Sequence, residues 1–346
     1  MKTAKRLSGV VLVGALAITT IIGFGGAASA QWENCTGNAG IDWDIQIGSC
    51  TAAIQSGRWQ GIDLAVIFNR RGLGYANKGQ YDHAIQDYDQ AIRLDSNHKS
   101  AFNNRGRAYR DKGQYDRAIQ DYDQAIRLDP TYVLAFNNRG LAYNNKGQPD
   151  RAIQDYDQAI SLDPNYALAF NSRGLAYNDK GQYDRAIQDY DQAISLDPNF
   201  SLAFNNRGVA FSNKGQYDRA IQDYNQAIKL DPNYAYAWNN RCWARAIVGQ
   251  LKRALKDCNK SLQLRSDDAN RFGSRGLTYL KLGRLNNAIA DYNSALKLNP
   301  KMASSLYGRG LAKQKKGDSA GGGADIAAAK AIDGKIVGTF AGYGVK

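Results

Sequence analysis

The sequence predicts an all-α solenoid built from repeated antiparallel helix pairs. The first observation is a strict 34-residue period at which an arginine recurs eight times: Arg71, Arg105, Arg139, Arg173, Arg207, Arg241, Arg275 and Arg309. The second is a glycine eight residues after each of these arginines. The third is apolar spacing typical of amphipathic helices on both sides of that glycine. A fixed period of this length indicates one stacked supersecondary unit, which mostly offers surface for binding.

Residues 133–166 illustrate one unit. Apolar and small residues recur at helical spacing before and after a break at 146–148: Phe136, Gly140 and Tyr143, then Ala152, Ile153, Tyr156, Ala159, Ile160 and Leu162. The break contains Gly147 and predicts a turn between two helices. The second helix ends at 163–165, because Pro164 cannot continue it.

This unit resembles the tetratricopeptide repeat, whose W-x2-L-G-x2-Y…A-x3-F…P pattern is matched by Phe136, Gly140, Tyr143, Ala152, Tyr156 and Pro164. Arg139 departs from the family, which usually has leucine there. The resemblance covers about residues 65–334 and implies a right-handed superhelix of eight tetratricopeptide repeats, the last one degenerate. It also implies a concave groove, lined by the first helices, that binds proteins or peptides. A narrower similarity is to exported bacterial members with an Asn-Arg-Gly motif.

The two ends of the chain differ from the repeats. Residues 1–30 combine a basic start, an apolar stretch and a small-residue end at 28–30, which predicts a Sec signal peptide cleaved after Ala30. The protein is then periplasmic or secreted; a retained membrane anchor is the alternative. Residues 31–64 are expected to form a disulfide-bearing capping segment. Residues 335–346 are expected to form a short tail that packs onto the last helix through Phe340 and Tyr343.

The four cysteines fit an exported protein. Cys35 and Cys50 lie 15 residues apart, and Cys242 and Cys258 lie 16 apart, which predicts two local disulfides in an oxidising compartment. Free buried thiols are the alternative for the second pair. A metal site would have to gather all four cysteines with almost no histidine, so we expect no metal and no cofactor.

An aspartate follows each arginine of the 34-residue period by 16 residues. In a helical hairpin that turns near Gly147, positions 16 apart lie nearly opposite each other across the two helices. We therefore expect structural ion pairs, within a repeat or shared with the next one: Arg139 with Asp155, Arg173 with Asp189 and Arg207 with Asp223. The fork of an arginine can hold a carboxylate with two hydrogen bonds. Two independent solvated stripes are the alternative.

Asparagine pairs recur in the first helix of the repeats, where asparagine is unfavourable and needs a reason. We expect them in the peptide-binding groove, in the register of the asparagine ladder that some tetratricopeptide-repeat proteins use to hold a peptide backbone. Hydrogen bonding between repeats is the alternative. The predicted groove residues are Asn103, Asn104, Asn137, Asn138, Asn171, Asn205, Asn206, Asn239, Asn240, Leu141, Leu175, Tyr236 and Trp243.

Charge is distributed unevenly along the chain. Residues 31–240 hold 22 basic and 25 acidic side chains, whereas residues 241–316 hold 17 basic and 4 acidic ones. Such a basic surface suits an acidic protein or an anionic envelope polymer. Nucleic acid would suit it electrostatically but fits poorly with export.

No catalytic constellation is apparent in the sequence. His83 and His98 are the two histidines and lack a triad context. Residues 321–323 are three glycines, but they lack the Lys-Ser/Thr of a phosphate-binding loop. We therefore expect a non-enzymatic envelope scaffold that grips a protein or extended peptide, with no small-molecule substrate. The alternative is an envelope structural protein attached to an anionic glycan or membrane surface through residues 241–316.

Overall fold

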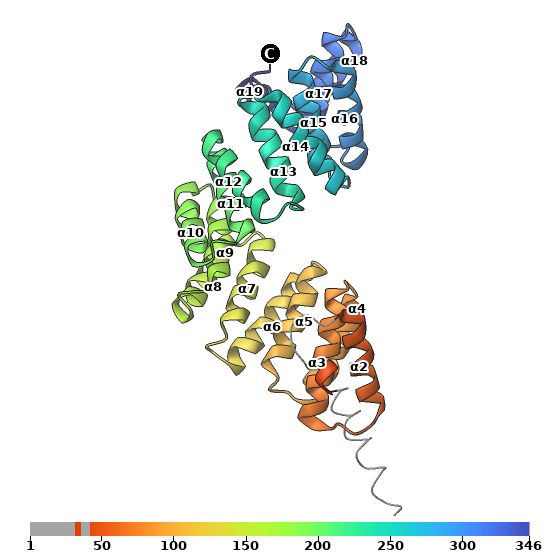
Figure 1. Ribbon diagram of the computed structural model, residues 1–346, viewed down its shortest axis with the longest axis vertical. Coiled ribbons are helices and arrows are strands. Elements are labelled where there is room, and N and C mark those ends of the chain that lie inside the picture. The colour runs from red at the N-terminus through yellow and green to blue at the C-terminus, as the bar shows by residue number, and fades with distance from the viewer. Residues whose placement is uncertain (1–31, 36–41, 346) are drawn as a thin grey trace, which may run out of the picture. The chain divides into compact units, whose positions relative to one another are not determined.

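The computed structural model describes residues 32–35 and 42–345, and its regular elements are all helices. Within each of the two compact units given below, consecutive helices pack against one another along the chain (Figure 1). This arrangement confirms the predicted all-α solenoid of paired helices. The signal peptide predicted over residues 1–30 lies outside the described residues.

The chain divides into two compact units, which we call unit 1 (residues 1–148) and unit 2 (residues 149–346). The helices of unit 1 are α2 (Trp43–Gln55), α3 (Gly61–Asn77), α4 (Tyr81–Leu94), α5 (Lys99–Asp111), α6 (Tyr115–Leu128) and α7 (Val133–Asn145). Those of unit 2 are α8 (Pro149–Leu162), α9 (Ala167–Asp179), α10 (Tyr183–Leu196), α11 (Ser201–Asn213), α12 (Tyr217–Leu230), α13 (Ala235–Ile247), α14 (Leu251–Leu264), α15 (Ala269–Lys281), α16 (Leu285–Leu298), α17 (Ala303–Lys315), α18 (Ser319–Ile332) and α19 (Ile336–Gly342).

A glycine in left-handed conformation separates the two helices of each repeat. Between α9 and α10, Gly181 has a φ of +72°, which a residue with a side chain rarely adopts. The Gln182 N–H donates to the Tyr177 carbonyl at 2.9 Å, and the Gly181 N–H donates to the Asn178 carbonyl at 2.9 Å. These two bonds form a Schellman motif, so the recurring glycine fixes where each first helix ends.

A glycine and a tyrosine 16 residues apart bring the two helices of most repeats together. A Cβ added to Gly208 would lie 2.6 Å from Cε1 of Tyr224, and one added to Gly276 would lie 2.8 Å from Cε1 of Tyr292. Both tyrosines are buried. The ring therefore occupies the space that the missing glycine side chain leaves, and this pair forms the centre of each small core.

Repeat 6, formed by α13 and α14, replaces this pair with a disulfide. Cys242 and Cys258 stand at the glycine and tyrosine positions and are bonded to each other. The Thr278 hydroxyl lies 3.7 Å from Cys242 Sγ, at a position that holds the buried Ala244 one repeat earlier. Three positions thus change together, from glycine, tyrosine and alanine to two cysteines and a threonine.

We expect the glycine, tyrosine and alanine found at these positions in other repeats to stabilise repeat 6 nearly as well as the disulfide does. Cys242→Ser with Cys258→Ser removes a cross-link that closes a loop of 16 residues and should lower the free energy of unfolding by about 3 kcal/mol. Cys242→Gly with Cys258→Tyr and Thr278→Ala should recover most of that loss by restoring aromatic packing. Urea unfolding with and without a reductant measures both. A triple variant as unstable as the serine variant would show that the two arrangements are not equivalent.

The two ends of the described chain are closed by short elements. At the amino end, a disulfide joins Cys35 to Cys50 of α2, and the rings of Trp32 and Trp59 stack with centroids 4.5 Å apart. At the carboxyl end, α18 is a full helix of 14 residues despite its glycines. The tail beyond it forms α19, which packs against α17 as well as α18.

No helix among the described residues is long and apolar enough to cross a membrane.

Candidate protein-binding site

The recurring arginines bind carboxylates within the scaffold. Arg207 donates through Nε and Nη2 to both carboxylate oxygens of Asp223, at 2.9 and 2.7 Å. Its Nη1 donates to Asp191 of the preceding repeat at 2.6 Å. Hydrogen bonding to Asp223 raises the pKa of Arg207, which therefore stays charged. The same two-oxygen contact, 16 residues along, occurs in Arg71–Asp87, Arg105–Asp121, Arg173–Asp189, Arg241–Asp257, Arg275–Asp291 and Arg309–Asp325.

Six of these arginines thus bind both a residue of their own repeat and one of the preceding repeat: Arg105, Arg173, Arg207, Arg241, Arg275 and Arg309. The sequence offered these as alternatives, and the structure contains both. Arg173, for example, donates to Asp189 within its repeat and through Nη1 to Asp157 of the preceding one. Arg139 donates through Nη1 to Asp123, and its predicted pairing with Asp155 stays a prediction. Because these guanidinium groups are held by carboxylates, the arginine period is part of the scaffold and is not a basic binding stripe.

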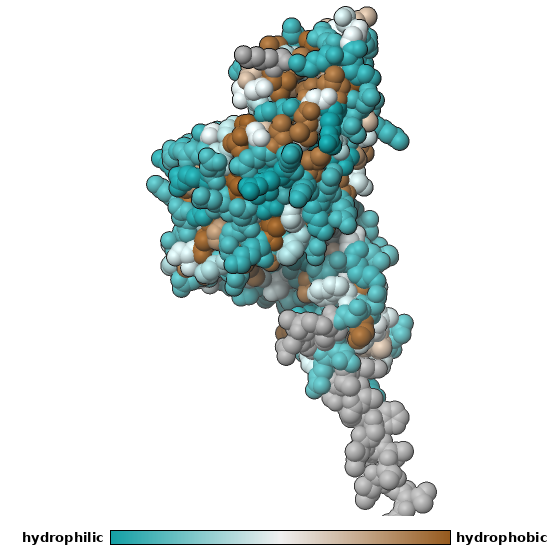
Figure 2. Space-filling view, turned by 45° about the horizontal axis from the view of Figure 1, so that its top comes forward, coloured by the Kyte–Doolittle hydropathy of each residue, from teal (hydrophilic) through white to brown (hydrophobic). Residues whose placement is uncertain are grey.

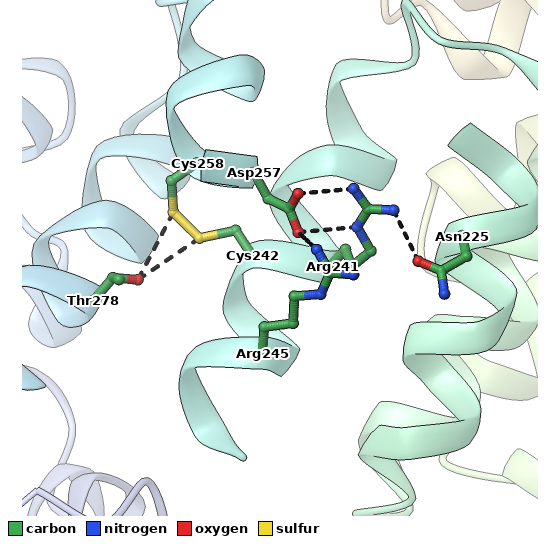
Figure 3. A network of polar contacts seen from close by, with 7 residues as sticks. All are labelled: Asn225, Arg241, Cys242, Arg245, Asp257, Cys258 and Thr278. Atoms are coloured by element: carbon green, nitrogen blue, oxygen red, sulfur yellow. Dashed lines mark hydrogen bonds and ion pairs between the residues drawn. A yellow bond between two sulfur atoms is a disulfide. The ribbon is translucent and has the colours of Figure 1, made fainter. Parts of the chain in front are cut away.

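The partner in the preceding repeat changes along the chain. It is aspartate at positions 89, 123, 157 and 191, but Asn225 accepts from Arg241 in repeat 6 (Figure 3). Asn259 and Asn293 take this role for Arg275 and Arg309. Each such contact loses one negative charge, and the two at Asn259 and Asn293 account for part of the basic character of residues 241–316.

The asparagine pairs hydrogen-bond to one another between repeats. The second asparagine of a pair donates from Nδ2 to Oδ1 of an asparagine in the preceding repeat, 35 residues earlier. These contacts are Asn104–Asn69, Asn138–Asn103, Asn206–Asn171 and Asn240–Asn205, at 2.9–3.0 Å. The alternative of bonding between repeats is therefore realised, and the amides help to set how each repeat packs on its neighbour.

Burial separates the two members of each pair. The first asparagines, Asn103, Asn137, Asn171 and Asn205, are at most 5% exposed, so these four predicted groove residues are not available to a peptide. Asn104, Asn138, Asn206 and Asn240 are half-buried and lie next to the accessible face. In the pairs that begin at Asn103, Asn137 and Asn205, peptide contact is thus restricted to the second member.

The series of asparagine contacts stops in unit 2. Asn239 would accept from position 274, but that position holds Ser274, and Asn239 Oδ1 is buried with no hydrogen-bond partner among the described residues. An unpaired buried acceptor is costly in a protein interior. Asn239 therefore offers an unused acceptor beside its neighbour Asn240.

A cavity of about 380 Å³ lies at this point in unit 2. Most of its wall comes from the first helices of four successive repeats, α11, α13, α15 and α17. Among its lining residues are the predicted Tyr236, Asn239, Asn240 and Trp243. Tyr236 is 47% exposed, whereas Trp243 is half-buried. The structure thus brings together the predicted groove residues of repeat 6.

The predicted groove residues and the residues that line the cavity do not fully coincide. Leu141 and Leu175 are half-buried and do not line it. Asn270, Ser274 and Leu277 of α15 do line it, although this repeat has no asparagine pair to mark them in the sequence. The tail residues Phe340 and Tyr343 also contribute to the wall, which the sequence pattern alone could not place there. Figure 2 shows apolar side chains gathered toward the C-terminal end of unit 2.

The outer face of α14 carries exposed cations. Lys252, Arg253 and Lys256 are exposed and form no ion pair with the acidic side chains of the described chain. The corresponding residues of α12 are Asp218, Arg219 and Gln222. Two substitutions on one helix therefore turn a mixed surface into a basic one.

Comparisons with known proteins agree with this architecture. Profiles described as "TPR repeat" and "Tetratricopeptide repeat" match the chain at residues 106–147, 174–215 and 276–317, at 65–98, 133–166 and 201–234, and at 87–120 and 155–188. A search of curated proteins found no match to this sequence.

Solved structures with the same helical architecture are distant in sequence. The APC/C complex Cut9–Hcn1 has a TM-score of 0.66 at 17% identity over 82% of this chain, which spans about half (54%) of that one. A tetratricopeptide repeat protein from Parabacteroides merdae has a TM-score of 0.56 at 21% identity, covering 72% of this chain and 98% of its own. PilF of Pseudomonas aeruginosa has a TM-score of 0.54 at 17% identity, covering 60% and 94%. These likenesses show the fold, and with the profile matches they lead to one conclusion: the chain belongs to the tetratricopeptide repeat family.

Proposed function

We propose that this protein is a non-enzymatic scaffold of the bacterial cell envelope that holds an extended segment of a partner protein against the first helices of its repeats. The observation that carries the proposal is the cavity of unit 2, whose wall comes mainly from α11, α13, α15 and α17. It combines exposed aromatic surface at Tyr236 with amide groups at Asn239 and Asn240. An amide can donate to and accept from a peptide backbone whatever its side chains are.

The envelope location is the part of this proposal that rests on the sequence. Its support is the signal-like segment at residues 1–30 and the two disulfides, which persist in oxidising compartments. The half-buried Asn104 and Asn138 give unit 1 an amide-bearing first-helix face of its own. Each unit is thus proposed to contact the partner through its first helices.

Site-specific photo-crosslinking tests this binding mode. A photoreactive phenylalanine at Tyr236 keeps an aromatic side chain at the cavity, and the same residue at Val248 provides a control, because Val248 is 37% exposed but does not line the cavity. Irradiation of intact cells followed by mass spectrometry should identify a partner segment attached at position 236 and absent from position 248. Equal products at both positions would contradict binding at the first-helix face.

The cations of α14 favour a second candidate, attachment to an anionic glycan or membrane surface through residues 241–316. Co-sedimentation with anionic lipid vesicles measures such attachment. Lys252→Asp with Lys256→Gln introduces the residues of α12 and should abolish binding, which should also weaken as salt rises. The reverse swap, Asp218→Lys with Gln222→Lys, is the matched control. Binding that survives Lys252→Asp with Lys256→Gln would remove this candidate.

A further inference from the structure

The carboxyl-terminal tail returns to the face that we propose for partner binding. The ring of Phe340 meets that of Tyr307 on α17 with centroids 4.8 Å apart. The ring of Tyr343 meets that of Trp243 on α13 at 5.4 Å, nearly perpendicular to it. The tail thus extends from repeat 8, formed by α17 and α18, back to repeat 6. Its helix α19 lies beside the first helices of these repeats (Figure 1). The sequence predicted that the tail packs onto the last helix of the repeats; in the structure it also reaches α13 and α17.

A lysine holds the tail backbone in place. Lys281 at the end of α15 donates from Nζ to the carbonyl of Tyr343 at 2.7 Å and to the carbonyl of Ile247 at 3.2 Å. Its side chain is partly buried, which lowers its pKa. The tail is therefore bound as a peptide ligand would be, through two aromatic side chains and one backbone carbonyl.

The tail can detach from the first helices without unfolding of the repeats. Its helix, α19, has seven residues and contains Gly338 and Gly342, so it has little stability of its own and depends on packing. Phe340 and Ile336 are buried, but Val337 is 41% exposed on the other side of the helix. Because the tail adds only three buried side chains, Ile336, Phe340 and Val345, to a core formed by the repeats, it is the kind of element that opens locally while the rest stays folded.

We propose that residues 336–345 are an internal ligand of unit 2, and that the partner segment bound there carries an aromatic pair spaced three residues apart, like Phe340 of α19 and Tyr343 at its C-cap. This inference rests on the proposed function, since it assigns the chemistry of the segment held at the same face. The covalent link gives the tail an effective concentration of about millimolar, so a partner competes with it and binds more weakly than to an open site.

The probe for this inference is a fluorescent synthetic peptide with the sequence of residues 333–346. In the full chain, Phe340→Ala with Tyr343→Ala should free the face, and the peptide should bind this variant about tenfold tighter than the wild type, as measured by fluorescence anisotropy. Val337→Ala with Ala341→Ser changes two exposed positions of the same helix and should bind like the wild type. A peptide in which both aromatic residues are alanine should not bind. Equal affinity for wild type and opened variant would overturn the proposal.

Hydrogen exchange of the wild type is a second measurement that does not depend on any variant. Amides of residues 339–345 should exchange faster than those of α17, because the tail opens without unfolding the repeats. Exchange of both at the same slow rate would show that the tail is a permanent part of the core and would overturn the proposal. These outcomes are separate from crosslinking at position 236. A tail that opens while position 236 yields no partner would contradict the proposed function alone.

Discussion

Raising the pH above about 10 is expected to unfold this protein over one or two pH units. Burial raises the pKa of five tyrosines at the centre of the repeats: Tyr88, Tyr122, Tyr190, Tyr224 and Tyr292. The folded chain keeps phenolic protons that the unfolded chain releases above its ordinary tyrosine pKa. The stabilising effect is therefore complete below about pH 10 and is lost as the pH rises further.

The expected size of this effect is large for a protein of ordinary stability. Above about pH 10, each buried tyrosine lowers the free energy of unfolding by about 1.4 kcal/mol per pH unit, so the five together lower it by about 7 kcal/mol per unit. Folded domains are typically stable by about 5–15 kcal/mol. Circular dichroism and tyrosinate absorbance should change together in an alkaline titration. Gradual tyrosine ionisation with full retention of helix would contradict the prediction.

Phenylalanine variants isolate the cause. The hydroxyls of Tyr122 and Tyr292 are buried and have no hydrogen-bond partner among the described residues. Tyr122→Phe with Tyr292→Phe should leave stability at neutral pH unchanged or higher, and should move unfolding to higher pH. Tyr236→Phe, at an exposed position, should change neither.

The second large effect is expected from removing one arginine of the 34-residue period. Arg207→Ala leaves the carboxylate of Asp223, whose residue is 6% exposed, without the guanidinium that binds both its oxygens. Loss of one partner of a buried ion pair should lower the free energy of unfolding by about 3–5 kcal/mol. Arg207→Lys should fall between this value and the wild type, because an ammonium cannot reproduce the two parallel hydrogen bonds. Urea unfolding followed by circular dichroism measures each variant.

The same repeat offers a matched control at its edge. Lys214 forms an ion pair with Asp184, and both side chains are accessible to solvent. Exposed pairs of this kind contribute about 0–1 kcal/mol, so Lys214→Ala should have little effect. Comparable losses for Arg207→Ala and Lys214→Ala would mean that burial does not determine the strength of these contacts.

Much of the structure within a repeat could be predicted, because the sequence of a single repeat determines which of its residues face each other. The spacing of 16 residues between Arg207 and Asp223 corresponds to facing positions across a hairpin, and the glycine turn fixes that hairpin. The same geometry places Cys242 against Cys258. Contacts of this kind depend only on helical periodicity and on where the turn lies.

Contacts between neighbouring repeats were harder to predict. Whether Asn205 faces a ligand or the next repeat depends on the angle at which two helix pairs stack, and a single repeat does not contain that angle. The structure buries Asn205 under Asn240. The return of Tyr343 to Trp243 crosses 100 residues and follows no periodicity, so neither the tail contact nor its part in the cavity wall could be read from the repeat.

The reach of the polar contacts has a consequence for folding. Arginine contacts join residues 16 apart, and asparagine contacts join residues 35 apart, so these bonds connect a repeat to itself or to its neighbour. In such a chain, folding can begin in any repeat and spread, without waiting for distant segments to meet. The tail is different, because it fastens repeat 8 to repeat 6 over 100 residues. Because the tail opens while the repeats stay folded, we expect this contact not to join repeats 6 to 8 into one cooperative block, and their unfolding should spread between neighbours as in the other repeats.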